Sequence, residues 1–290
     1  MPGTTAADEP QRIILITGCS SGIGERAAHI LRGRDWRVFA TARKEADVAR
    51  LRDKGFESLR LDYEDEAGVL AAAEHVLERT HGRLDALFNN GAYAIPGALE
   101  DMPSDALRGL FEANFIGWHT LTRAVIPAMR AQGAGRIVQC SSILGFIGMP
   151  YRGAYNASKY ALEGYSDTLR LELAGTGIHV SLIEPGPIAT RFTKNAMANF
   201  DRVIGAEGMA ASPHRAAYEK RLARMKAGEP SLFKLSSRAV VKHLVHAVES
   251  PRPRVRYRVT VPTTAMAVAK RLLTSRGLDR VLTRAARSEE

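Results

Sequence analysis

The chain contains very little cysteine. Only Cys19 and Cys140 occur among its 290 residues, and each lies within an expected strand or in the turn that ends one. Two such separated cysteines provide neither a disulfide framework nor a cluster with metal-ligand spacing. The sequence therefore predicts a protein without a metal site and favours a reducing, cytoplasmic compartment.

Long apolar runs are also missing. Nowhere do 18 apolar residues follow one another, and the first dozen residues have no basic start followed by an apolar stretch. A membrane-spanning helix requires about 20 apolar residues, and a secretory signal requires such a start. The sequence therefore disfavours a membrane-spanning protein and a secreted protein. We expect residues 1–11 to form a flexible N-terminus.

Negative charge is scarce near the C-terminus. Residues 251–290 hold ten Lys or Arg and three Asp or Glu, which is +7 of the chain's net charge of +10. Such a tail can contact nucleic acid or an anionic membrane. However, it holds few aromatic residues, and Arg254, Arg256 and Arg258 alternate as one solvated strand face would. We expect no nucleic-acid partner.

Short apolar runs alternate with helix-length segments along residues 12–262. Strands are expected at 13–16, 37–41, 84–88, 136–140 and 179–183, and a further strand should end at Asp62. Runs that are apolar on both faces and separated by 10 to 30 residues need crossover helices between parallel strands. The sequence predicts a single doubly wound α/β domain with helices on both faces of its sheet.

Two segments depart from this pattern. Residues 190–234 have helical propensity and scattered apolar residues, which indicates an insertion near the ligand; it forms either a lid or ordinary helix contacts. Residues 263–290 form a basic helical extension. This extension either lies on a membrane surface or packs on its own domain or a second copy.

A glycine-rich turn follows the first expected strand. Its glycines are Gly18, Gly22 and Gly24, in the sequence TGCSSGIG over residues 17–24. One glycine permits the tight turn, another lets the main chain approach a pyrophosphate, and the last allows close packing of strand and helix. We expect the dinucleotide phosphates to lie against Gly18, Ser20, Ser21, Gly22, Ile23 and Gly24.

Residues at the ends of the next strands are candidate contacts of the dinucleotide, and one of them bears on whether it is NADP(H) or NAD. Ala42 and Arg43 end the second strand, where an acid would bind a ribose hydroxyl and a cation would bind a 2′-phosphate, so Arg43 favours NADP(H) over NAD. Arg43 can also simply open a solvated helix. Asp62 accepts a hydrogen bond from the adenine or caps a helix, and Asn89 and Gly91 either contact the cofactor or form a plain turn.

Tyr155 and Lys159 are spaced by four residues in YNASK, which places the phenol and the ammonium on one helix face. A free tyrosine titrates near a pKa of 10, so proton exchange at neutral pH needs a nearby positive charge. Tyr155 is therefore the candidate general acid of a reduction and base of an oxidation. Ser142 ends a strand and can bind the substrate oxygen, and Asn114 can fix Lys159 through a water molecule.

Together these motifs resemble those of the short-chain dehydrogenase/reductase family, through residues 17–24, NNG at 89–91, Asn114, Ser142, YNASK and PGPIAT at 185–190. The resemblance implies a Rossmann-like domain with a seven-stranded parallel sheet and catalytic roles for Asn114, Ser142, Tyr155 and Lys159. It also implies that the nicotinamide lies by Pro185, Gly186, Ile188 and Thr190, and that the chain forms a homodimer or homotetramer. One departure is the order Gly91-Ala92, where the family usually has Ala then Gly.

The turn, Arg43 and the long insertion look like those of family members that act on hydroxysteroids, retinoids and other lipophilic carbonyls. The expected pocket is apolar, with Ile143, Phe146, Met149 and Tyr151 on one side and Tyr93 and Ile95 on the other. We therefore expect an NADP(H)-dependent carbonyl reductase. The alternatives are an NADP(H)-binding sensor without turnover and a reductase that is held at a membrane by its C-terminal helix.

Overall fold

The computed structural model describes residues 10–227 and 233–288, and most of the expected flexible N-terminus lies outside them. Its main sheet has seven parallel strands, as predicted. Across the sheet they are β3 (Glu57–Arg60), β2 (Arg37–Ala42), β1 (Ile13–Ile16), β4 (Ala86–Asn89), β5 (Gly135–Cys140), β6 (Ile178–Glu184) and β9 (Arg256–Arg258). The order reverses between β1 and β4, which is where ligands bind to doubly wound sheets.

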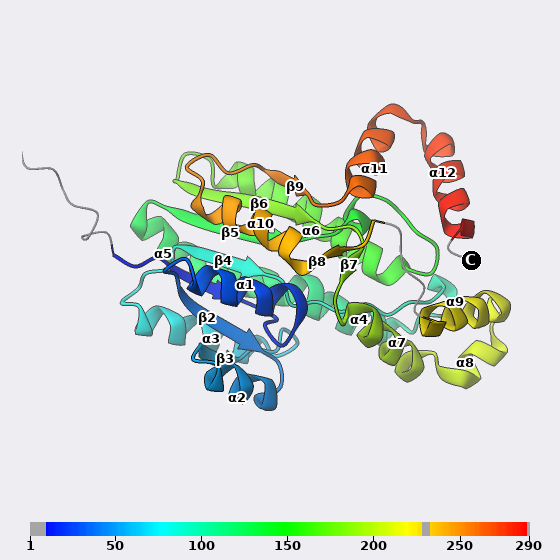
Figure 1. Cartoon of the computed structure of the whole chain (residues 1–290), viewed down its shortest axis with the longest axis horizontal. Helices are drawn as coiled ribbons and strands as arrows, with labels where there is room; N and C mark the ends of the chain where they lie inside the picture. Colours follow the sequence, from blue (N-terminus) through cyan, green and yellow to red (C-terminus); the bar gives the residue numbers. More distant parts are fainter. Residues whose placement is uncertain (1–9, 228–232, 289–290) are drawn as a thin grey trace, which may run out of the picture.

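Helices cover both faces of the sheet, so the central strands are buried on each side. Helices α1 (Gly22–Arg32) and α10 (Ser237–Glu249) lie side by side in front of the sheet in Figure 1. Behind it lie α3 (Glu66–Arg79), α5 (Gly117–Gln132) and α6 (Gly153–Glu172), and α2 (Glu45–Asp53) packs beside β2 and β3. These layers enclose one apolar core around the sheet.

The helix that carries Asn114 is not continuous. Helix α4 (Ser104–Phe111) leads into a π-helical turn, η2 (Glu112–Ile116), and only then into α5. The wider turn inserts a residue into the helical repeat, which is common at functional sites. Asn114 lies within this turn and is fully buried.

The segment after β6 forms helices over the carboxyl ends of the strands. It leaves through β7 (Ile188–Ala189), which pairs with β8 (Leu235–Ser236) where the segment returns. Between them lie α7 (Phe192–Val203), α8 (Gly205–Ala211) and α9 (Arg215–Ala227), at the right-hand end of Figure 1. Phe200, Ile204 and Tyr218 form a small separate core there with Ala98.

The strand β9 corrects one expectation. Arg256 and Arg258 do not form a solvated face, because their Nε atoms lie 3.0 and 3.5 Å from the two carboxylate oxygens of buried Glu184. Arg256 also contacts Glu163 and Asp167. The last strand is therefore joined to the domain by charge as well as by its backbone.

The chain ends in α11 (Val261–Leu272) and α12 (Ser275–Ser288), a helical hairpin at the upper right of Figure 1. Across the described residues, no helix combines the length and apolar character needed to cross a bilayer.

Candidate active site

The glycine turn joins β1 to α1 at the centre of the sheet. Gly18 and Gly22 have φ values of 67° and 65°, which favour glycine. A Cβ on Gly24 would lie 2.4 Å from the Gly18 carbonyl oxygen, so this glycine is needed for close packing of turn and helix. No side chain within the described residues caps the N-terminus of α1, so its first backbone N–H groups are available to a phosphate group.

The neighbouring turn after β4 is fixed to the glycine turn by Thr17. Its Oγ1 accepts hydrogen bonds from the backbone N–H groups of Asn90, at 2.8 Å, and Gly91, at 3.2 Å. A Cβ on Gly18 would lie 2.6 Å from the Gly91 Cα, so the two turns touch. The exchanged order Gly91-Ala92 therefore places the smaller residue where the two backbones meet.

Asn89 faces the protein interior, although it was predicted at the cofactor. Its Oδ1 lies 2.8 Å from the Tyr63 hydroxyl, and its Nδ2 donates to Thr122 Oγ1 at 3.0 Å. The Tyr63 hydroxyl also lies 2.8 Å from Thr17 Oγ1. Asn89 thus belongs to a buried hydrogen-bond network that holds the two turns in place. Tyr63, which no sequence motif marks, is part of the same network.

The PGPIAT segment lies over the glycine turn. Thr190 is next to Gly22, since a Cβ on that glycine would lie 3.1 Å from the Thr190 Cγ2. Pro185 accepts a hydrogen bond from the Ile143 backbone at 2.8 Å, which connects this segment to the loop after Ser142. Gly186 has no space for a side chain against Thr260, and Ile188 begins the short strand β7.

Arg43 lies at the exposed end of β2, just before α2, and makes no ion pair within the described part of the chain. Asp62 is partly exposed and lies two residues after the end of β3, which stops at Arg60 and not at Asp62 as predicted. Its Oδ1 accepts from the Glu64 backbone at 3.3 Å, and Oδ2 lies 3.8 Å from Arg60. Arg43 is thus available for an anionic ligand, whereas Asp62 has local partners already.

Tyr155 and Lys159 lie on the buried face of α6, as the four-residue spacing predicted. Lys159 is fully buried; its Nζ donates to the Cys140 carbonyl at 2.8 Å and lies 4.1 Å from the Trp118 ring centroid. Burial lowers the pKa of this ammonium to about 8. Nζ is 5.7 Å from the centroid of the Tyr155 ring. The ammonium and the phenol therefore lie close enough to interact electrostatically.

The phenol of Tyr155 is held in a low-dielectric environment. Burial raises its pKa above the ordinary value, while a hydrogen bond with Ser142 and the charge of Arg152 lower it. Ser142 Oγ also accepts from the Leu144 backbone at 3.1 Å, which fixes the start of η3 (Ile143–Gly145). The phenol and the serine hydroxyl thus face the same point, as a reacting carbonyl oxygen requires.

Asn114 supports the opposite wall. Its Oδ1 accepts from the Tyr93 backbone N–H at 3.0 Å, and its Nδ2 donates to the Tyr93 carbonyl at 2.8 Å. Nδ2 is also 3.3 Å from Ser158 Oγ. Asn114 therefore ties the loop after β4 to α6 between Tyr155 and Lys159. Its predicted link to Lys159 through water stays a prediction.

Phe192 is a residue that the sequence motifs do not mark. It begins α7, and its ring lies edge-on to the Tyr155 ring at a centroid distance of 5.4 Å. Ala94, Ala196 and Leu144 complete an apolar cluster around the phenol. The insertion thus reaches the proposed catalytic tyrosine directly, and no local pattern near Phe192 announces that contact.

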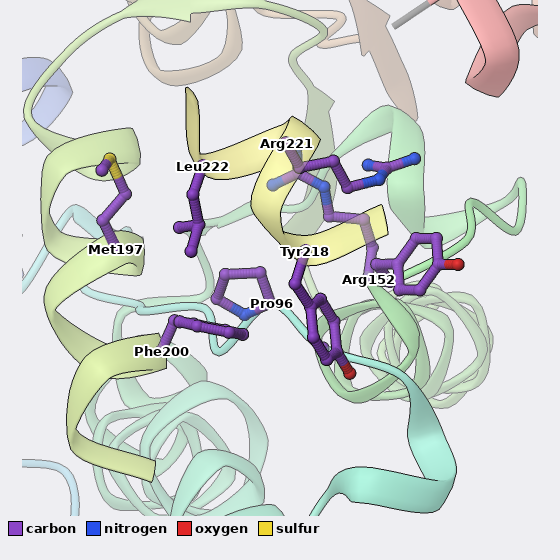
Figure 2. A pocket seen from close by; sticks show the side chains of 9 residues that line it. Pro96, Arg152, Met197, Phe200, Tyr218, Arg221 and Leu222 are labelled. Carbon is purple, nitrogen blue, oxygen red and sulfur yellow. The ribbon is translucent and has the colours of Figure 1, made fainter. Parts of the chain in front are cut away.

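A pocket opens beside this cluster, between α7, α9 and the loop after β4 (Figure 2). Its walls are mostly apolar and include Tyr151, as predicted, but the expected Ile143, Phe146, Met149, Tyr93 and Ile95 are not among its lining residues. Two charged side chains, Arg152 and Arg221, also lie on its walls, and the Arg221 guanidinium is 4.6 Å from the centroid of the Tyr151 ring. It is lined by Pro96, Gly97, Tyr151, Arg152, Met197, Phe200, Tyr218, Arg221 and Leu222.

No cluster of metal-ligating side chains occurs among the described residues. Cys19 and Cys140 are both buried thiols, and burial raises their pKa values to about 12 and about 11. Neither thiol is suited to be a nucleophile. The glycine turn and the start of α1 do fit a nicotinamide dinucleotide, because glycines with positive φ lead from β1 into a helix whose N-terminus has no side-chain cap.

Comparison with known proteins agrees with this geometry. The short chain dehydrogenase family model matches residues 12–200. An uncharacterized oxidoreductase, YbbO of Escherichia coli K12, is 42% identical over 94% of each chain. Human 17-beta-hydroxysteroid dehydrogenase type 1 is 33% identical over 86% of this chain and 77% of its own.

The fold also occurs in solved structures. A short chain dehydrogenase/reductase from Burkholderia phymatum, solved in complex with NAD, superposes with a TM-score of 0.74. It is 26% identical, and the match covers 90% of this chain and 92% of that one. The sequence match, the seven-stranded sheet and the Ser142–Tyr155–Lys159 site agree, and the chain belongs to the short-chain dehydrogenase/reductase family of oxidoreductases.

Proposed function

We propose that this protein is an NADP(H)-dependent reductase that interconverts a lipophilic carbonyl compound and its alcohol. The observation that carries the proposal is the convergence of Ser142, Tyr155 and Lys159 at the carboxyl edge of the sheet, between the glycine turn and an apolar pocket. A protein that only binds a dinucleotide needs no phenol beside a buried ammonium.

In reduction, Ser142 and Tyr155 bind the carbonyl oxygen, and Tyr155 delivers a proton to it. The cofactor supplies the hydride. Burial disfavours the phenolate that forms, and the hydrogen bond with Ser142 and the charge of Arg152 oppose this effect. The Lys159 ammonium, 5.7 Å from the centroid of the phenol ring, is a further positive charge beside it. Asn114 holds the loop after β4 in place beside helix α6. We propose that this keeps the substrate's carbonyl oxygen within reach of the Ser142 and Tyr155 hydroxyl groups. In oxidation, Tyr155 takes the proton back.

The cofactor preference rests on Arg43. It lies where a dinucleotide's adenosine ribose meets the end of β2, and no acidic side chain within the described residues neutralises it through an ion pair. A 2′-phosphate would provide the missing anion, whereas an unphosphorylated ribose would leave the guanidinium without a partner. The proposed residues at the phosphates and nicotinamide are those of the glycine turn, Gly91 and the Pro185–Thr190 segment.

The substrate class follows from the apolar walls around Tyr155. Phe192, Ala94 and Ala196 surround the phenol, and Met197, Phe200 and Leu222 line the adjoining pocket. Such walls favour an aliphatic, aromatic or steroid-like carbonyl over a sugar. The name of the human relative, a hydroxysteroid dehydrogenase, also points to a lipophilic substrate. We propose a cytoplasmic homo-oligomer, because members of the family generally associate.

The test follows NADPH and NADH absorbance with aliphatic aldehydes, aromatic ketones, retinal and ketosteroids, alongside Tyr155→Phe. We expect turnover with NADPH and a loss of at least about a hundredfold in kcat for the variant, because it lacks the proton donor. NADPH binding by both proteins is the control. Tight binding without turnover of any carbonyl would favour a sensor, and binding of neither nucleotide would refute the proposal.

A further inference from the structure

Helix α11 presents an apolar stripe away from the protein. Its inward side chains, Thr263 and Ala267, are buried against the domain. On the other side, Val261, Ala265, Val268 and Leu272 recur at spacings of four, three and four residues, which places them on one face. Val261 is 68% exposed, Val268 49% and Leu272 78%. An amphipathic surface helix normally turns such a stripe inward, so this face has no partner within the described chain.

The stripe continues into the turn between α11 and α12. Leu273 is 41% exposed, and Leu272 is the most exposed large apolar side chain of the described residues. Helix α12, by contrast, buries Leu282 and Ala286. The two helices stand out from the body as a hairpin (Figure 1). Most of the unpartnered apolar surface therefore lies on α11 and the hairpin turn, and the described part of α12 adds only Val281, which is 38% exposed.

Positive charge surrounds this surface. Lys270 and Arg271 precede Leu272, and Arg276, Arg280 and Arg284 recur every four residues on α12, all exposed. None of the four arginines makes an ion pair within the part of the chain that the structure describes. Residues 261–284 hold five basic side chains and one acidic side chain, Asp279. The hairpin is thus a cationic surface with an apolar stripe.

We propose that the α11–α12 hairpin docks on an anionic membrane surface, with Val268, Leu272 and Leu273 inserted at the level of the headgroups. Basic side chains near such a surface are attracted to it, and exposed leucines gain from entering the acyl boundary. A second copy docked on the same stripe would bring two cationic surfaces together, which is unfavourable. The contact is interfacial, because neither helix is built to span a bilayer.

Docking would bring the end of the molecule that carries the proposed substrate pocket near the lipid. The hairpin and helices α7 to α9 lie at the same end of the molecule in Figure 1, where the carboxyl ends of the strands also point. A lipophilic carbonyl dissolved in the membrane would meet the protein at this end. This consequence rests on the proposed function, whereas the membrane contact itself does not.

The test is flotation of the full-length protein with vesicles of phosphatidylcholine alone or mixed with phosphatidylglycerol. We expect binding to the anionic vesicles only, and its loss at high salt. Val268→Gln/Leu272→Gln should weaken binding at least about tenfold, since two apolar side chains no longer enter the boundary. Arg276→Gln/Arg280→Gln should weaken it as well. Leu171→Gln, on α6, removes an apolar side chain that is 67% exposed and is the matched control.

Two results would overturn the proposal: no wild-type binding to anionic vesicles, or undiminished binding by Val268→Gln/Leu272→Gln. If that variant instead changes only the oligomeric state in sedimentation, the stripe is a contact between copies, which also overturns it. Aldehyde reduction by each variant in vesicle-free buffer reports on folding. Absence of turnover in wild type would refute the proposed function but leave the vesicle result standing.

Discussion

At the scale of single residues, two cations near the cofactor site differ in their surroundings. Arg50 is held by Glu25 and Asp47, with nitrogen–oxygen distances of 2.8 and 3.2 Å. Arg43 makes no such pair within the described chain. A cation whose charge is already balanced adds little to phosphate binding, and an unbalanced cation adds a charge-assisted hydrogen bond. Arg43 is therefore the residue whose removal should change cofactor selection.

Arg43→Ala should raise the KM for NADPH about tenfold or more and leave the KM for NADH nearly unchanged. Loss of a hydrogen bond to a charged group costs about 1.5–3 kcal/mol, and 1.4 kcal/mol corresponds to a factor of ten. Initial rates with both cofactors at a saturating aldehyde measure the effect. Arg52→Ala is the control, since that guanidinium donates to the Ser58 carbonyl. An equal rise for both cofactors would show that Arg43 does not read the 2′-phosphate.

At the scale of elements, one set of hydrogen bonds holds the α8–α9 segment over the pocket. Asp101 Oδ2 accepts from Ser212 Oγ at 2.6 Å and from the Tyr218 hydroxyl, and the same hydroxyl accepts from the Ala98 backbone at 2.8 Å. These bonds connect η1 (Leu99–Asp101) to α9, far along the chain. Tyr218 thus anchors a segment that has only a small core of its own.

Tyr218→Phe should loosen this segment without unfolding the protein. The variant removes the bond to Asp101 and leaves the buried Ala98 N–H without its acceptor, which costs about 1–3 kcal/mol locally. Hydrogen exchange of amides in residues 205–222 should become about tenfold faster, and NADPH affinity should stay the same. Tyr165→Phe is the control, because it removes a tyrosine hydroxyl that contacts His119 and not the α8–α9 segment. Unchanged exchange in this segment would exclude the anchoring role.

The elements also show what the sequence could and could not predict. Continuous apolar runs indicated the buried strands, and the local spacing of Tyr155 and Lys159 indicated their shared helix face. The π-helical turn at Asn114 was not predicted, because one additional residue barely changes the apolar pattern of a helix. The inward orientation of Asn89 and the pairing of Arg256 with Glu184 depend on partners distant in sequence, and no local pattern identifies those partners.

At the scale of the whole molecule, the stability of the fold is coupled to buried charge behind the active site. Glu163 lies on α6 one turn after Lys159, and it faces Arg256, Glu184 and Ser141. A Cβ on Gly145 would lie 3.1 Å from its Oε1, so the carboxyl group packs against the loop that carries Ser142. Burial raises the pKa of Glu163 to about 7, with Glu184 adding to the rise and Arg256 opposing it.

The unfolding equilibrium should report this shift. The unfolded chain releases the Glu163 proton near pH 4.5, and the folded chain keeps it until about pH 7, so this group's contribution to stability is full below pH 4.5 and is lost as the pH rises to 7. Glu163→Gln, which resembles the protonated form, should therefore gain in Tm relative to wild type between pH 5 and pH 8. Denaturation scans at both pH values measure that difference.

Glu249→Gln provides a control of opposite sign. In the wild type, a hydrogen bond from Arg34 holds the pKa of the Glu249 carboxyl below its ordinary value, although burial acts against this. Its contribution to stability is thus present above the ordinary pKa, and the glutamine variant should be less stable than wild type at both pH 5 and pH 8. If Glu163→Gln loses Tm relative to wild type as the pH rises, the ion pair with Arg256 outweighs burial, and the carboxylate stabilises the last strand.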